Sequence, residues 1–210
     1  MADQEGHGLP GIMSRRRARA AGFTLIELMV TITLLAILAM LAAPSFSTWI
    51  KNSQLRATAE ALQNGLRLAQ AEALRRNRQT VFSLTNSASP ETGLTAVTNG
   101  RYWSINTVVL TGETTDVAAF VQSGVLTNTG VSITGPASIC FSSLGRLIAN
   151  ATPGIDGADC AANAAVDYNL SVPDSTDTRR LRVTVALGGQ VRMCDLDKTL
   201  SASHPDGCAP

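Results

Sequence analysis

The chain has 210 residues, a length that suits one domain or one domain with an appendage. Its 17 basic and 16 acidic residues nearly cancel, which excludes the global positive field of many nucleic-acid-binding proteins. A hydrophobic content of 45% with 16% charged residues excludes a disordered chain, and the 4% aromatic content indicates a mainly aliphatic core.

A long apolar segment lies near the N-terminus. Positions 28–50 contain no charged residue, which is enough chain to cross a bilayer. The four arginines at positions 15–19 are typical of a flank retained in the cytoplasm, so the C-terminal part is expected outside it. A secretory signal peptide would have a shorter apolar run, with small residues after it. Here Ala20, Ala21 and Gly22 precede the run, so cleavage at this point would leave the helix in the product.

Glu27 is the one ionisable residue between Phe23 and Ile50. A carboxylate within hydrocarbon costs about 2.5–3.5 kcal/mol or more unless it has a partner. Cleavage after Gly22 would give Phe23 a free α-amino group, one helical turn from Glu27 or close to Glu27 of a neighbouring copy. The alternative is a glutamate that lies at the headgroup boundary.

Residues 22–32, GFTLIELMVTI, resemble the type IV prepilin motif. The resemblance implies that a prepilin peptidase removes a leader of residues 1–22 by cutting after Gly22, and that it methylates the new N-terminal Phe23. It also implies that Glu27 guides assembly of the subunit into a filament.

The same resemblance assigns residues 23–50 to a transmembrane and assembly helix. Pro44 then matches the helix-kinking proline of pilins, and physically it removes one helical hydrogen bond. The implied location is the inner membrane in a single pass, with the head in the periplasm, and later a pilus or pseudopilus. The implied partners are prepilin peptidase, other major and minor pilins, and the inner-membrane assembly platform.

Residues 51–78 are predicted to form an amphipathic helix that packs on a globular head. Its apolar residues recur at spacings of three and four: Leu55, Ala59, Leu62, Leu66, Ala69 and Ala73. The opposite side carries the charged residues and is expected to be solvated. Gly65 weakens a helix by about 1 kcal/mol relative to alanine, so we expect close packing at that position.

Residues 79–210 are predicted to form a β-rich head. Short alternating runs between turn residues predict strands over 80–84, 102–110, 117–122, 131–134, 138–142, 168–172, 180–187 and 190–195. Gly188 and Gly189 between the last two predict a two-residue hairpin turn. The expected fold is α+β, with one long N-terminal helix laid on an antiparallel sheet, and the head is large enough to fold alone.

Three segments of the head are similar to GspH/FimT-type proteins, which are low-abundance minor pilins or pseudopilins. They are residues 139–146 (ICFSSLGR), 181–185 (LRVTV) and 189–194 (GQVRMC). In FimT-like members a Gly-Arg-x-Arg motif is associated with DNA binding during natural transformation. The corresponding residues here are Gly189, Gln190, Val191 and Arg192, so glutamine replaces the first arginine.

All four cysteines lie in the head, and none forms a Cys-x-x-Cys pair of the kind found in zinc sites. Disulfides are the default in an oxidising compartment. Three pairings are open, and the spacing favours Cys140 with Cys160 and Cys194 with Cys208. The second bond would close a loop worth about 3 kcal/mol in the chain-entropy model and would hold the C-terminal tail.

Two clusters of charge lie near the C-terminus. Arg180 and Arg182 would share one face of a strand, with Arg192 on the hairpin partner, and such a face can either bind phosphates non-specifically or protect a sheet from aggregation. Asp195, Asp197 and Asp206 offer oxygen ligands to calcium, but without EF-hand spacing we expect solvated acids and no metal site.

We expect no enzyme and no cofactor, because the two histidines, His7 and His204, lie near the termini and no nucleophile with a base can be assembled. The sequence therefore predicts a structural protein: a minor type IV pilin that primes or caps pilus assembly. The alternatives are a GspH-like pseudopilin of type II secretion and a pilus-borne DNA-binding subunit. Without the leader, 13 basic and 14 acidic residues leave a net charge of −1, so bulk charge does not recruit partners.

Overall fold

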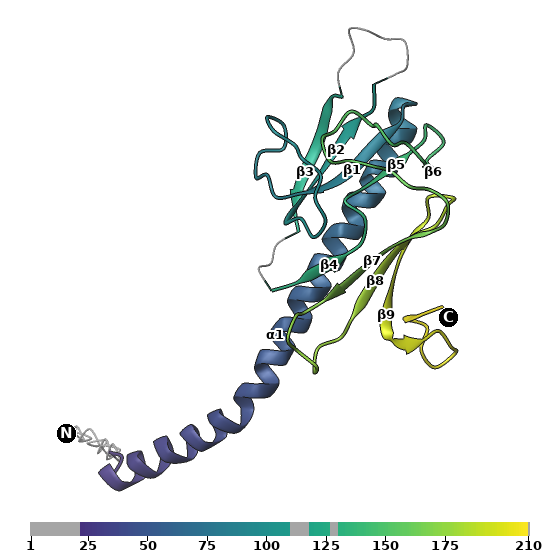
Figure 1. The fold of residues 1–210 in the computed structure, drawn as a ribbon. Coiled ribbons are helices and arrows are strands. Elements are labelled where there is room, and N and C mark those ends of the chain that lie inside the picture. Colours follow the sequence, from purple (N-terminus) through teal and green to yellow (C-terminus); the bar gives the residue numbers. More distant parts are fainter. Residues whose placement is uncertain (1–21, 110–117, 127–129, 210) are drawn as a thin grey trace, which may run out of the picture. The chain divides into compact units, whose positions relative to one another are not determined.

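The computed structural model describes residues 22–109, 118–126 and 130–209. Within them one helix, α1, covers Leu25–Arg76 and is followed by strands (Figure 1). The strands are β1 (Thr80–Thr85), β2 (Tyr102–Thr107), β3 (Phe120–Val125), β4 (Ser132–Thr134), β5 (Ser138–Phe141), β6 (Leu147–Ile148), β7 (Val166–Ser171), β8 (Leu181–Val185), β9 (Val191–Thr199) and β10 (Gly207–Cys208). The α+β fold is confirmed. The chain divides into two units, residues 1–43 and 44–210.

The second half of α1 packs on the strands through the predicted apolar face (Figure 1). All six residues of that face are at most 1% exposed: Leu55, Ala59, Leu62, Leu66, Ala69 and Ala73. Burial of each leucine contributes about 1.5–3 kcal/mol. Polar contacts add to this packing, since the Thr80 hydroxyl donates to the Ala69 carbonyl at 2.9 Å.

The C-terminal end of α1 is set by Asn77, whose φ of 52° is left-handed. The Arg78 N–H donates to the Ala73 carbonyl at 3.2 Å and the Asn77 N–H donates to the Leu74 carbonyl at 3.3 Å. This pair of bonds is a Schellman cap, in which asparagine tolerates the left-handed conformation. The helix therefore ends at Arg76, two residues before the predicted end.

The strands form two sheets, where the sequence predicted one. The first has the order β3-β2-β1-β5-β6 and the second has the order β10-β9-β8-β7-β4. The pairings are antiparallel except that of β10 with β9, which is parallel. Both sheets contribute side chains to one core beneath α1.

Gly65 lies where α1 packs tightly on the first sheet. A Cβ atom at this position would lie 3.0 Å from ring atoms of both Phe82 and Trp103, whose ring centroids are 6.0 Å apart. The close packing predicted for Gly65 is therefore confirmed, and its partners are these two aromatic rings.

The central strand of the first sheet, β1, is buried on both faces. Val81, Ser83 and Thr85 point away from α1, yet each is at most 1% exposed. The side chains packed over Val81 include Val108, Cys160 and Ile155, which follow the strands in loops. The disulfide between Cys140 on β5 and Cys160 attaches the loop that contains Ile155 and Cys160 to the sheet.

The predicted hairpin near the C-terminus is formed by β8 and β9, but its turn is longer than two residues. The Gly189 N–H donates to the Ala186 carbonyl at 2.7 Å, and Gly189 has a φ of +89°. A turn followed by a left-handed glycine is the usual three-residue hairpin loop. Strands β6 and β10 were not predicted, and residues 110 and 117 of the predicted strands 102–110 and 117–122 lie outside the described residues.

Candidate assembly helix and arginine face

Helix α1 begins directly after the proposed cleavage point. The Thr24 hydroxyl accepts a hydrogen bond from the Glu27 N–H at 3.2 Å, and the Leu28 N–H donates to the Thr24 carbonyl at 3.1 Å. Thr24 is thus the N-cap, with Glu27 at the third helical position, where an acidic side chain interacts favourably with the helix dipole. Neither bond uses a residue before Phe23, so removal of the leader would leave this cap intact.

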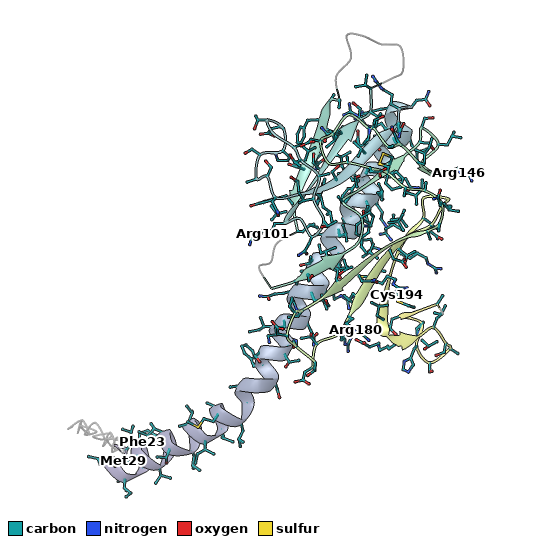
Figure 2. The ribbon with its side chains drawn as sticks, viewed as in Figure 1. Phe23, Met29, Arg101, Arg146, Arg180 and Cys194 are labelled. Atoms are coloured by element: carbon teal, nitrogen blue, oxygen red, sulfur yellow. A yellow bond between two sulfur atoms is a disulfide. The ribbon has the colours of Figure 1, made fainter. Side chains whose placement is uncertain are left out.

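Apart from Glu27, the first half of α1 is apolar on every side, and it has no packing partner among the described residues. Residues Leu25–Ala43 have a mean hydropathy of 2.5 and none of this segment is buried. The hydroxyls of Thr31 and Thr33 donate to carbonyls three residues earlier, at 2.9 Å each. Figure 2 shows side chains such as Phe23 and Met29 projecting from the helix. Such a surface suits lipid or other apolar helices.

Glu27 lies within this segment and is its one ionisable group. Among the described residues no cation forms an ion pair with its side chain, whereas the threonine hydroxyls donate hydrogen bonds within the helix. A carboxylate in this position is costly in hydrocarbon unless a cation reaches it. Its predicted role in assembly, like the processing of Gly22 and Phe23, stays a prediction. Helix α1 continues through Pro44 without interruption, and the bend expected there also stays a prediction.

The arginine face consists of Arg180, Arg182 and Arg192. Arg182 on β8 is paired with Cys194 on β9, and Arg192 with Thr184, so alternation puts Arg182 and Arg192 on the same side of the second sheet. Arg180 lies one residue before β8 and has the same parity. The arrangement expected from the sequence is therefore present.

Local acids offset much of the charge on this face. Arg180 donates through Nε to Asp197 Oδ1 at 2.8 Å, while Arg182 donates to Asn169 at 2.8 Å and lies 3.4 Å from Asp167. Burial raises the pKa of Asp197, but the hydrogen bonds from Arg180 outweigh this and lower it below its ordinary value. Arg192 is exposed, and among the described residues it has no acidic partner.

The C-terminal acids are likewise engaged by cations. Lys198 Nζ lies 2.5 Å from Asp206 and 3.8 Å from Asp195, which is 4% exposed. The hydrogen bond from Lys198 lowers the pKa of Asp206. Because Asp197 is bound to Arg180, each of the three acids, Asp195, Asp197 and Asp206, has a cationic partner. No cluster of three metal-binding side chains occurs within the described residues.

The structure also explains a glycine in the segment that resembles the DNA-binding motif. A Cβ atom on Gly189 would lie 1.9 Å from the Gly145 carbonyl oxygen, to which Gln70 of α1 also donates at 2.9 Å. Gly189 is therefore required where the β8–β9 turn packs on the loop after β5. Gln190 and Arg192 remain exposed, whereas Val191 between them is buried. The sequence pattern alone did not reveal this contact.

Two disulfides join the cysteines in sequence-local pairs. Cys140 is bonded to Cys160 with a Cα–Cα distance of 5.5 Å, and Cys194 is bonded to Cys208 with 5.0 Å. The second bond attaches β10 and the tail to β9, beside the ion pair of Lys198 with Asp206. No described cysteine is free.

Comparison with known proteins agrees with this architecture. The prokaryotic N-terminal methylation motif matches residues 17–43, and the family described as type II transport protein GspH matches residues 58–189. The chain is 33% identical to the fimbrial protein EcpC of Eikenella corrodens over 147 residues, which are 70% of this chain and 86% of that protein.

Two solved structures are more distant. The type IV minor pilin FimU of Pseudomonas aeruginosa is 15% identical, with a TM-score of 0.47 over 69% of this chain and 91% of FimU. The minor pseudopilin EpsH of the Vibrio cholerae type 2 secretion system is 11% identical, with a TM-score of 0.42 over 68% of this chain and 97% of EpsH. On the sequence matches, which span the methylation motif and most of the head, this chain belongs to the GspH family of type IV pilin-like proteins.

Proposed function

We propose that the chain is a minor type IV pilin that primes or caps pilus assembly. It is inserted in the inner membrane with its head in the periplasm, cut after Gly22 by prepilin peptidase and methylated at Phe23. The observation that carries the proposal is the first half of α1, a helical segment with no buried residue that lies inside the match to the methylation motif. A surface of this kind is stable only in lipid or among other apolar helices.

Glu27 would set the register between subunits. In the membrane its carboxylate needs a cation, and the α-amino group of Phe23, on the same or a neighbouring subunit, is the nearest one that processing would create. Because the Thr24 cap does not depend on the leader, the helix would present both groups at its first turn. Satisfying the two charges together favours one alignment of neighbouring helices over others.

The pilus is favoured over a secretion system by one relative, since the protein from Eikenella corrodens is named a fimbrial protein. The second candidate is a pseudopilin of type II secretion, which the description of the matched family favours. Both functions would use the same N-terminal helix, and both would have other pilins and the inner-membrane assembly platform as partners.

The DNA-binding alternative depends on the arginine face. Arg180 and Arg182 are occupied by acidic or amide side chains, so Arg192 is the group best placed to contact a phosphate. A gel shift of the head with Arg192→Ala, beside Arg180→Ala, over a series of salt concentrations tests it. Equal retardation of DNA by the wild-type head and by both variants would contradict a role for this face.

The experiment that separates the first two candidates is deletion of the gene, followed by measurement of sheared surface pili and of secreted exoproteins. The proposal predicts loss of pili with secretion intact, and restoration of pili by the wild-type gene. Normal pili with failed secretion would assign the protein to type II secretion. Normal pili with normal secretion would contradict both roles.

A further inference from the structure

A groove of about 380 Å³ opens between α1 and the end of the second sheet. It lies entirely within residues 44–210. Its floor is apolar, formed by Leu55, Leu181 and Met193, and its rim holds Trp49, Asn52 and Arg179. The groove therefore combines an apolar surface with a guanidinium group at its edge.

The backbone of Arg179 is fixed at the groove, whereas its guanidinium group has no acidic partner among the described residues. Its backbone N–H donates to Asn52 Oδ1 at 2.9 Å, which fixes the loop before β8 to α1. The next residue, Arg180, is bound to Asp197, and Arg56 on the groove wall is bound to Glu60 at 2.9 Å. Within residues 22–109, 118–126 and 130–209, no acidic side chain pairs with Arg179. An external anion can therefore bind it.

The aromatic side of the groove faces solvent. Trp49 is 64% exposed and stacks on Phe46, which is 61% exposed, with ring centroids 5.8 Å apart. Exposed tryptophans of membrane proteins concentrate at the membrane–water interface. Trp49 lies six helical positions after Ala43, the last residue of the apolar segment, which corresponds to about 9 Å of helix. This short tether keeps Trp49 within reach of the lipid headgroups however the head is turned.

We propose that the groove binds the headgroup of an anionic phospholipid, with Arg179 on the phosphate and the apolar floor against the glycerol and first methylenes. A guanidinium group donates two parallel hydrogen bonds to a phosphate, which suits this position. Because the chain without its leader has a net charge of −1, the attraction has to come from a local site of this kind. The bound lipid would hold the head against the membrane until the subunit enters the filament.

The proposal rests on the membrane-anchored state described under Proposed function. It is tested in lipid nanodiscs with the chain without its leader, residues 23–210, because the leader arginines would themselves attract anionic lipid. Nanodiscs contain phosphatidylcholine and phosphatidylglycerol with matched acyl chains, and native mass spectrometry measures which lipid the protein retains. Brominated versions of each lipid then quench tryptophan fluorescence. The chain has two tryptophans, and Trp103 is 7% exposed inside the head, so quenching reports on Trp49.

The wild-type chain should retain phosphatidylglycerol about fivefold over phosphatidylcholine, with stronger quenching by the brominated anionic lipid. Arg179→Gln should abolish both preferences. Arg146→Gln removes the same charge from an exposed loop after β5, labelled in Figure 2, and should keep both.

Equal retention of the two lipids, or an equal loss in both variants, would overturn the lipid site. So would cross-linking of the groove to an acidic segment of another pilin with no lipid retained, which would assign it to a protein partner. Co-purification of the chain with nanodiscs is a separate readout. Its failure would contradict membrane anchoring, and with it both this proposal and the proposed function.

Discussion

In α1, residues 25–43 and residues 55–73 are both rich in leucine and alanine, but they differ in where those side chains lie. The first segment is apolar all round and has no buried residue, whereas the second buries one face and exposes charged residues on the other. The difference comes from the spacing of the apolar residues rather than from their number. Apolar residues at every third and fourth position form one face that packs on a core, whereas a helix that is apolar on all sides has to be surrounded by lipid or by other subunits.

The largest expected effect comes from separating the two segments. A chain that begins at Ile50 should be soluble, monomeric and cooperatively folded, because it retains the whole buried face of α1 and both sheets. The full chain should partition into membranes. Size-exclusion chromatography and thermal unfolding check the fragment, and aggregation of the fragment without a cooperative transition would contradict the division.

Substitutions in the two segments should differ in their effect on stability. Leu62→Ala should lower the free energy of unfolding of the head by about 2–5 kcal/mol, because Leu62 is fully buried in the core. Leu34→Ala, at a position 56% exposed, should leave it unchanged. Urea unfolding of the full chain in detergent, followed by Trp103 fluorescence, measures both. Similar losses would show that the first segment also supports the head.

The two disulfides allow a comparison inside the head. Replacing Cys194 and Cys208 together by alanine should cost about 3 kcal/mol, chiefly through the unfolded chain. Replacing Cys140 and Cys160 should cost more, because both are at most 2% exposed and their sulfur atoms also fill the outer face of the first sheet. Denaturant unfolding of each double variant beside the wild-type head checks the order, and the reverse order would contradict it.

The smallest expected effect is at the end of α1. Hydrogen bonds from Arg75 and then Arg76 lower the pKa of Glu72 from 4.5 to about 2. A carboxyl with a lowered pKa in the folded state stabilises above its unfolded pKa, and that contribution is lost as pH falls from about 4.5 to about 2. Glu72→Gln should therefore flatten the acid side of the stability curve, while Glu60→Gln should change it less. If the free energy of unfolding of Glu72→Gln depended on pH as that of the wild type does, the lowered pKa of Glu72 would be contradicted.

Periodicity and motif predicted the parts of the molecule whose partners are close in sequence. The buried face of α1, the hairpin of β8 and β9 and the close packing at Gly65 follow from local patterns. The first sheet was harder, because residues such as Ser83 are buried by loops that lie far along the chain and therefore break the expected alternation. Strands β6 and β10 have two residues each, too few to carry a pattern.

The candidate sites differ in the same way. The N-terminal motif is contiguous, so the sequence alone located its residues. The sequence did not reveal the partners of Arg182, Asp167 and Asn169, because they come from the neighbouring strand β7. The groove beside Trp49 combines residues more than a hundred positions apart, and its parts have no shared sequence signal.

The central claim is that the first segment of α1 assembles subunits and that Glu27 sets their alignment. The most direct measurement is the amount of this protein in sheared pili from strains that express Glu27→Ala or, as a matched loss of one acid on the exposed side of α1, Glu60→Ala. Glu27→Ala should reduce incorporation about tenfold or more, with normal amounts in the membrane fraction, and Glu60→Ala should be incorporated like the wild type. Incorporation of Glu27→Ala at the wild-type level would contradict the account.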